Sequence, residues 1–299
     1  MAERFPVDAR RGLLMTSAGG LLFTFDLPLL RLAGADKWTL IFSRGAMLFL
    51  AITAVWWLLR RLNGTNGSYI AGRAGWAVVA TYTIANITYI AAITETAAAN
   101  VVLITALIPI VTALLSRVFI GEAIHAFTWI ATVLSVFGVG MIFWDSLHAG
   151  DILGDVLAMI SCVFVAMAFT IIRASGKNVA TSLGVGSLTS AAVALGVIMW
   201  GGVETTPLDA QGWFFVALSG LVVIPLASTF IANGPRFLPS ADVSMFFLLE
   251  TVLTPIWIYM LFQELPTRQV LIGGAIVITT LVVHSAWRLL WSQRCPGET

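Results

Sequence analysis

Charged side chains are scarce in this chain. They account for 10% of its 299 residues, hydrophobic residues account for 59%, and the net charge is only +1. Soluble domains carry about 25% charged residues, so a mean hydropathy of +0.95 excludes an ordinary soluble domain. Little chain is left outside the apolar runs for a soluble catalytic or nucleotide-binding domain, and we expect no nucleic-acid partner.

Residues that bind metals and phosphates are also few. The two cysteines, Cys162 and Cys295, are too few and too far apart in the sequence to indicate a disulfide framework. The three histidines, His125, His148 and His284, have no metal-ligand spacing. The chain has no G-x-x-x-x-G-K-[ST] motif, so ATP is not its own energy source. We therefore expect no metal and no cofactor.

Long apolar runs dominate the sequence. A helix needs about 20 mostly apolar residues to span a bilayer. Ten such runs lie at about 12–33, 38–59, 75–93, 97–120, 124–144, 151–173, 181–200, 212–233, 239–262 and 267–290. The runs are continuous, whereas transmembrane strands would alternate. The sequence therefore predicts an all-α membrane protein with ten transmembrane helices.

The chain repeats itself after a shift of 142 residues. The shift places Val101 on Val243, Thr112 on Thr254, Glu122 on Glu264, Gly12 on Gly154 and Arg31 on Arg173. We interpret this as a duplication, with one five-helix repeat at 11–145 and a second at 151–291. Because five is odd, the second repeat enters the membrane from the opposite side. Inverted repeats of this kind are typical of transporters.

The Lys and Arg residues predict the orientation. Twelve of the sixteen fall on the side that holds the N-terminus, three (Arg31, Lys37 and Arg268) fall on the other, and Arg44 lies inside a helix. Cytoplasmic loops carry the excess of positive charge, so both termini should be cytoplasmic. Residues 1–11 lack the apolar core of a signal peptide, and we expect no cleavage.

Two charges of opposite sign lie at similar depth in the first two helices. Asp26 lies 7 residues before Ala33, and Arg44 lies 6 residues after Trp38, so both are roughly 9–10 Å inside the same helix ends. Intramembrane charges usually pair. We expect a structural ion pair, with an outer gate as the alternative.

Helix 3 carries Tyr82, Asn86 and Tyr89 on one face. These polar groups need partners, either water and solute in a cavity or a neighbouring helix, and both explanations stay open. Pro109 removes a backbone hydrogen bond near the middle of helix 4 and predicts a kink. The candidate hinges are Pro109, Pro225 and Pro255.

Glu250 is the most unusual residue of the chain. It lies ten or so residues after Pro239, a distance along the helix that corresponds to the bilayer centre. Phe246 and Trp257 share its helix face. A carboxylate there costs about 3 kcal/mol or more unless it is paired, hydrated or protonated. We weigh three roles: counter-ion to a substrate ammonium, proton carrier, or structural group bonded to a neighbouring helix, for instance at Asn86.

The segment ALIPIVTALLSRVFIGE, in which Glu122 follows Pro109 by 13 positions, resembles the drug/metabolite transporter superfamily in its EamA-type branch. The likeness covers nearly the whole chain as two repeats. The second copy departs from the pattern, with Thr251 in place of proline and Gln263 in place of glycine. Within the family the chain resembles YddG-type exporters of aromatic and other amino acids. The resemblance implies efflux of small metabolites across the inner membrane, through a cavity lined by helices 3, 4, 8 and 9 and parts of 1 and 6.

The leading hypothesis is a secondary transporter that exports aromatic and hydrophobic amino acids by alternating access. The expected substrate-binding residues are Tyr82, Asn86, Tyr89, Thr105, Ser161, Ser228, Phe246, Glu250 and Trp257. One alternative is export of lipophilic cations or drugs in the same fold. Another is an intramembrane hydrolase with Ser187 and His284. The expected partners are a small-molecule substrate and the lipid bilayer, and a monomer is the simplest assembly.

Overall fold

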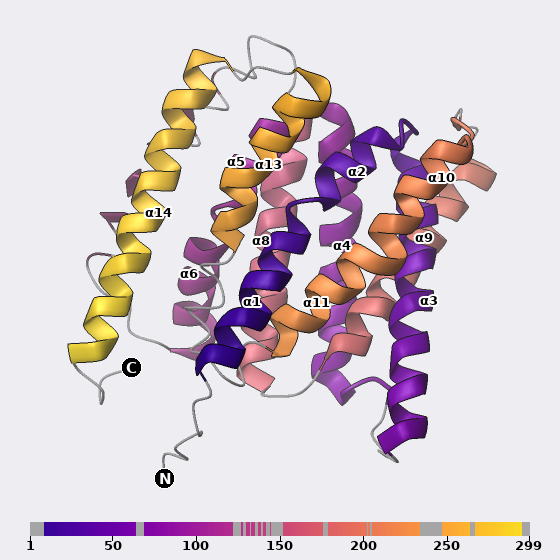
Figure 1. Cartoon of the computed structure of the whole chain (residues 1–299), viewed down its shortest axis with the longest axis horizontal. Helices are drawn as coiled ribbons and strands as arrows, with labels where there is room; N and C mark the ends of the chain where they lie inside the picture. The colour runs from indigo at the N-terminus through magenta and orange to yellow at the C-terminus, as the bar shows by residue number, and fades with distance from the viewer. Residues whose placement is uncertain are drawn as a thin grey trace.

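The computed structural model describes residues 9–63, 69–121, 152–175, 179–201, 203, 205–233, 247–263 and 267–294, together with single residues between 127 and 144. Within these residues every regular element is helical (Figure 1). The helices of the first half are α1 (Ala9–Phe23), α2 (Asp26–Leu32), α3 (Lys37–Asn63), α4 (Gly72–Glu95), α5 (Ala98–Thr105) and α6 (Ile108–Ile120). Those of the second half are α8 (Ile152–Ser175), α9 (Ala180–Trp200), α10 (Ala210–Ala217), the π-helix η1 (Leu218–Val223), α11 (Ile224–Asn233), α13 (Phe247–Phe262) and α14 (Arg268–Arg294).

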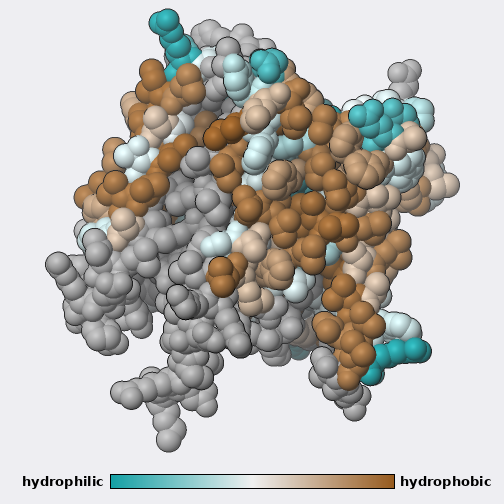
Figure 2. Space-filling model, in the orientation of Figure 1, coloured by the Kyte–Doolittle hydropathy of each residue, from teal (hydrophilic) through white to brown (hydrophobic). Residues whose placement is uncertain are grey.

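Six stretches are long and apolar enough to cross a membrane. They are Lys37–Leu62, Gly72–Glu95, Asn100–Ile120, Ile152–Ile172, Thr181–Trp200 and Ala210–Ile231. Figure 2 shows a brown, apolar surface across the middle of the visible face, with hydrophilic atoms near its upper and lower edges. The chain is therefore a multi-pass, all-helical membrane protein. The count of ten spans stays a prediction, because the run at 124–144 is described only at scattered positions.

The contacts between the two halves are symmetric: the largest of them have counterparts when the halves are interchanged. In the repeat register, α1 corresponds to α8, α4 to α10–α11, and α5–α6 to α13. The helix α8 packs on α4 and α6, and its counterpart α1 packs on α11 and α13. A further large interface joins α3 to α9, which are counterparts of each other, and α9 also packs on α4 as its counterpart α3 packs on η1. Such a pattern supports a twofold relation between the halves, and α1 begins at the end of the molecule where α14 ends (Figure 1).

The first predicted span is not one continuous helix. The helix α1 ends at Phe23 and α2 begins at Asp26, so the run at 12–33 consists of two helices separated by a short break. Pro28 has no N–H, which leaves the carbonyl of Thr24 without a partner inside the helix. The hydroxyl of Thr254 in α13 donates to that carbonyl at 3.2 Å. The break is therefore stabilised by the other half of the protein.

Prolines mark two further irregularities. The helix that contains Pro109 is interrupted at Ala106 and Leu107, between α5 and α6, one turn or less before the proline. The π-helix η1 ends directly before Ile224 and Pro225, and its wider turn makes room for a proline that cannot donate to the preceding turn. By contrast, α13 continues through Pro255 without a break. Hinge motion at these prolines stays a prediction.

Glycines allow helices of the two halves to approach closely, as three positions illustrate. A Cβ atom on Gly45 of α3 would lie 2.6 Å from the Ser187 carbonyl oxygen of α9. A Cβ on Gly186 would lie 3.0 Å from the ring of Tyr82, and one on Gly154 would lie 2.5 Å from Thr96. Because membrane helices associate largely through close packing, larger residues here would push the halves apart.

Asp36 organises the loop between α2 and α3. Its carboxylate accepts hydrogen bonds from the backbone amides of Trp38 and Thr39, from the Thr39 hydroxyl, and from the amide of Thr206 in the second half. Partial burial raises the pKa of Asp36, but these hydrogen bonds outweigh burial and hold the pKa below its usual value. Asp36 therefore starts α3 as a charged N-cap and ties it to the loop before α10.

Candidate functional site

A buried ion pair joins α2 to α3. The Arg44 Nη2 atom lies 2.7 Å from Asp26 Oδ2, and Arg44 Nε lies 3.3 Å from Asp26 Oδ1. The two side chains are only 4% and 3% exposed. Asp26 and Arg44, which were expected to pair because they lie at similar depth, are thus paired in the structure. A bidentate geometry of this kind fixes both side chains.

The ion pair is the centre of a network that reaches into both halves. Arg44 Nη1 donates to Asn86 Oδ1 at 2.7 Å, and Asn86 Nδ2 donates to Ser190 Oγ of α9 at 2.7 Å. The hydroxyl of Ser219, in η1, donates to Asp26 Oδ1 at 2.6 Å. All five residues are buried. Sequence reasoning missed Ser190 and Ser219, because a serine in a membrane helix usually bonds to its own backbone and nothing in the pattern distinguishes these two.

Glu250 lies close to this network in the first turn of α13. Its carboxyl group is a hydrogen-bond partner of the Tyr89 hydroxyl on α4, and it is near enough to Asp26 to interact with it electrostatically. Glu250, Tyr82 and Tyr89 each keep part of their surface accessible. Among the described residues no Lys or Arg forms an ion pair with Glu250. Among the described residues, the site therefore holds two carboxyl groups, Asp26 and Glu250, and one cation, Arg44.

Aromatic side chains lie between the broken helix and α13. The rings of Phe25 and Trp257 stack with their centroids 5.2 Å apart. The indole N–H of Trp257 donates to the Thr24 hydroxyl at 3.2 Å. Phe25, in the break between α1 and α2, thus stacks on a tryptophan of α13, the helix that also carries Glu250.

Comparison with known proteins identifies this arrangement of helices. The EamA-like transporter family matches residues 10–144 and, a second time, residues 152–286. The chain belongs to the EamA-like transporter family. It is therefore a membrane transporter of small molecules, built from two EamA repeats.

The other comparisons establish the fold only. A solved structure described only as "Crystal structure of protein" superposes on this EamA transporter with a TM-score of 0.68 and 15% sequence identity. The alignment covers 92% of this chain and 97% of that one. No curated protein matches the chain. The YddG-type branch therefore stays a prediction from the sequence.

Several residues expected to bind substrate have protein partners in this EamA transporter. The oxygen and the nitrogen of the Asn86 amide bond to Arg44 and Ser190. The residue that bonds to Glu250 is therefore Tyr89, not Asn86 as one hypothesis proposed. Ser161 Oγ donates to the Ala85 carbonyl at 3.0 Å, and Thr105 Oγ1 donates to the Val102 carbonyl at 3.1 Å. These groups hold helices together or cap their own backbone. Ser228, on α11, is partly accessible, and Phe246 lies outside the described residues.

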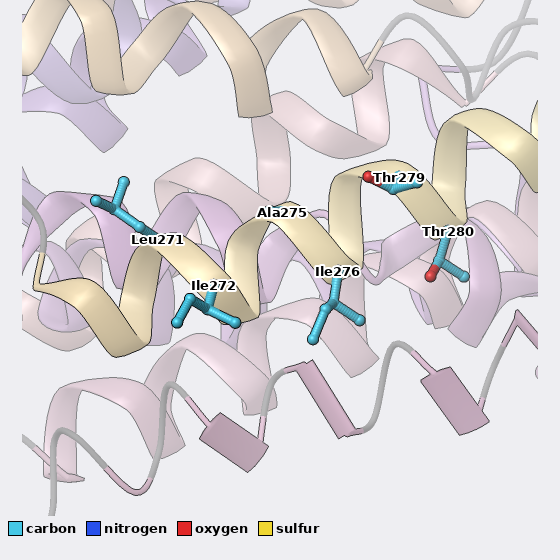
Figure 3. Close-up of a pocket in the computed structure, with 6 residues that line it drawn as sticks. All are labelled: Leu271, Ile272, Ala275, Ile276, Thr279 and Thr280. Atoms are coloured by element: carbon cyan, nitrogen blue, oxygen red, sulfur yellow. The ribbon is translucent and has the colours of Figure 1, made fainter.

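Two surface hollows lie away from the Glu250 site. The larger, about 520 Å³, follows one face of α14 (Figure 3) and is lined by Leu271, Ile272, Ala275, Ile276, Thr279 and Thr280. It offers two hydroxyls and no charge, so it is an apolar helix face suited to lipid. The smaller, about 330 Å³, lies where α2 ends and α4 ends, and is lined by Leu30, Arg31, Gly34, Ala35, Leu40, Ile93, Thr94 and Phe262.

The described part of the chain does not assemble a hydrolase dyad. Ser187 lies on α9 against α3, where its hydroxyl donates to the Leu183 carbonyl at 3.0 Å. The helix α14, which carries His284, packs on α5 and α13, and Figure 1 shows α9 and α14 on opposite sides of the molecule. Nor do the described residues contain a group of three or more His, Cys, Asp or Glu that could hold a metal ion.

Proposed function

We propose that this transporter exports amino acids with aromatic or other apolar side chains across the inner membrane by alternating access. The observation that carries the proposal is Glu250: a residue that keeps part of its surface accessible, whose carboxyl group bonds to Tyr89 and has no cationic partner among the described residues. A substrate ammonium would supply the missing positive charge. Tyr82 and the Phe25–Trp257 pair would contact the apolar side chain.

A second candidate is export of lipophilic cations. The same observations favour it, since a carboxyl group beside aromatic rings binds a cation through charge and cation–π contacts. Uptake into inside-out vesicles separates the two. We expect labelled phenylalanine to accumulate and to be displaced by tryptophan and leucine. Accumulation of tetraphenylphosphonium without phenylalanine uptake would instead establish the cation exporter.

The orientation of the chain is tested with reporter fusions. The twelve-to-three distribution of Lys and Arg predicts that both termini are cytoplasmic. A reporter that is active only in the periplasm should therefore be silent when it is fused after Thr299. The same reporter inserted at Gly34, in the loop between α2 and α3, should be active and serves as the control. Activity at Thr299 would show that the orientation is reversed or that the number of spans is odd.

The face of α4 divides into binding and structural residues. Tyr82→Ala and Tyr89→Ala should weaken phenylalanine binding about 3- to 10-fold, because each removes an aromatic contact, while folded yield stays near that of the wild type.

Asn86→Ala should instead lower the free energy of unfolding by about 1–3 kcal/mol, because it leaves buried groups of Arg44 and Ser190 without partners. Phenylalanine binding to the purified variants and their yield after size-exclusion chromatography distinguish a loss of binding from a loss of folded protein. Tyrosine variants that lose only yield would make this face a packing surface.

A further inference from the structure

The end of α3 carries two arginines whose charges are not neutralised in the described part of the chain. Arg60 and Arg61 are exposed, and the ion pairs among the described residues are Arg44–Asp26 and Lys37–Glu95. Each guanidinium instead lies over an indole ring, Arg60 at 5.0 Å from the centroid of Trp56 and Arg61 at 3.8 Å from that of Trp57. Stacking on an aromatic ring orients a guanidinium and leaves its N–H groups available at the edge.

The aromatic base under these arginines is held in place. The ring of Trp56 packs edge-on against Tyr69, with centroids 4.9 Å apart. The hydroxyls of Tyr69 and Thr53 share a hydrogen bond of 2.7 Å, and the Tyr69 carbonyl accepts one from Thr181 of α9. The Trp56 side of the platform is thus fixed by contacts that reach α9, and less side-chain entropy is lost there when a ligand binds.

The depth of this platform matches the phosphate layer of a bilayer. The 27 residues of α3 extend about 40 Å, whereas the hydrocarbon core is about 30 Å thick, so the last two turns leave the core. Tryptophan is enriched at that boundary. Helical side chains point toward the helix N-terminus, which directs both guanidinium groups back toward the membrane (the lower end of α3 in Figure 1).

Exposed apolar side chains surround the two charges. Leu58 is 52% exposed, Leu59 is 48% exposed and Leu62 is 71% exposed. A free phosphate would use the arginines and leave these leucines unused. A phospholipid with a net negative headgroup uses both, through its phosphate and its acyl chains.

We propose that Trp56, Trp57, Arg60 and Arg61 form a binding site for an anionic phospholipid at the membrane interface. Two neighbouring guanidinium groups favour a lipid that carries two phosphates over one that carries a single phosphate. The site is independent of the substrate site and of the identity of the substrate.

The test uses the purified full-length protein in a neutral detergent. Cardiolipin, phosphatidylglycerol and phosphatidylcholine are added in turn, and lipid affinity is measured by native mass spectrometry and by the shift of the thermal unfolding midpoint. Each interfacial arginine contributes about fivefold to the binding of an anionic lipid. We expect cardiolipin to bind about 20-fold more tightly than phosphatidylcholine, and the R60Q/R61Q variant to lose that preference.

Two further variants locate the effect. Arg73→Gln removes an exposed arginine that lies in the first turn of α4 and stacks on no ring among the described residues, so it should keep at least half of the preference. Trp57→Leu keeps both charges but removes one ring, and should lower cardiolipin affinity about threefold. Equal binding of all three lipids by the wild type would overturn the proposal, as would a preference that survives R60Q/R61Q. An equal shift by millimolar inorganic phosphate would also overturn it, because the site would then take a free anion.

Discussion

Glu250→Gln is expected to lower the affinity for amino acids about 10- to 100-fold. The substitution keeps the size of the side chain and a hydrogen-bonding oxygen for Tyr89, but it removes the charge that would face the substrate ammonium. A hydrogen bond to a charged group is worth about 1.5–3 kcal/mol, which corresponds to this range. Equilibrium binding of labelled phenylalanine to purified protein measures the loss.

Substrate analogues show which group of the substrate Glu250 recognises. Phenethylamine keeps the ammonium of phenylalanine and lacks its carboxylate, whereas 3-phenyllactate lacks the ammonium. The wild type should prefer phenethylamine, and Glu250→Gln should lose that preference. The matched control is Glu95→Gln, which removes a carboxylate that is 32% exposed and paired with Lys37 at the end of α4. That control should bind both analogues as the wild type does.

Transport separates the remaining roles of Glu250. If Glu250 carries protons, Glu250→Gln should still exchange amino acids across liposomes while losing its response to a pH gradient. If it acts as a counter-ion, exchange should fall together with binding. Unchanged affinity together with unchanged pH dependence would make Glu250 a structural residue bonded to Tyr89, and would remove the observation on which the proposed function rests.

Depth along a helix was enough to predict the ion pair but not the partner of Glu250. Asp26 and Arg44 lie at matching depth in the first two spans, and this depth was the basis for pairing them. Asn86 and Tyr89 lie one turn apart on α4, and both could reach Glu250 by depth alone. The guanidinium of Arg44 has more donors than Asp26 can accept, and it binds the Asn86 amide. Tertiary geometry therefore decided between them.

Backbone irregularities explain the other differences. Proline positions predicted where hydrogen bonds would be lost, but not which group would replace them; for the Thr24 carbonyl it is Thr254, 230 positions away in sequence. The π-helix before Pro225 changes the number of residues per turn. A helical period of 3.6 therefore does not describe the residues of η1, one of which, Ser219, donates to Asp26. Ser228, predicted to bind substrate, stays a prediction.

Arg44→Gln is expected to destabilise the folded protein by about 3–5 kcal/mol. The substitution leaves the Asp26 carboxylate buried without a cation, and removal of one partner of a buried pair costs that much. It also removes the donor to Asn86. The measurement is the unfolding free energy in mixed micelles, with the thermal midpoint as a second readout. The matched control is Lys37→Gln on the same helix, which breaks a pair that is about one-third exposed and should cost less than about 1 kcal/mol.

A double substitution distinguishes an ion pair from general loss of packing. Asp26→Asn alone should also destabilise, because it leaves Arg44 without its counter-ion. The combined Asp26→Asn, Arg44→Gln variant holds no unpaired charge, and it should recover about 1–2 kcal/mol relative to the sum of the single variants. Additive losses would show that the two charges do not stabilise each other. Positive coupling would show that Asp26 and Arg44 stabilise each other within the first half, in a network that reaches the second half through Ser190 and Ser219.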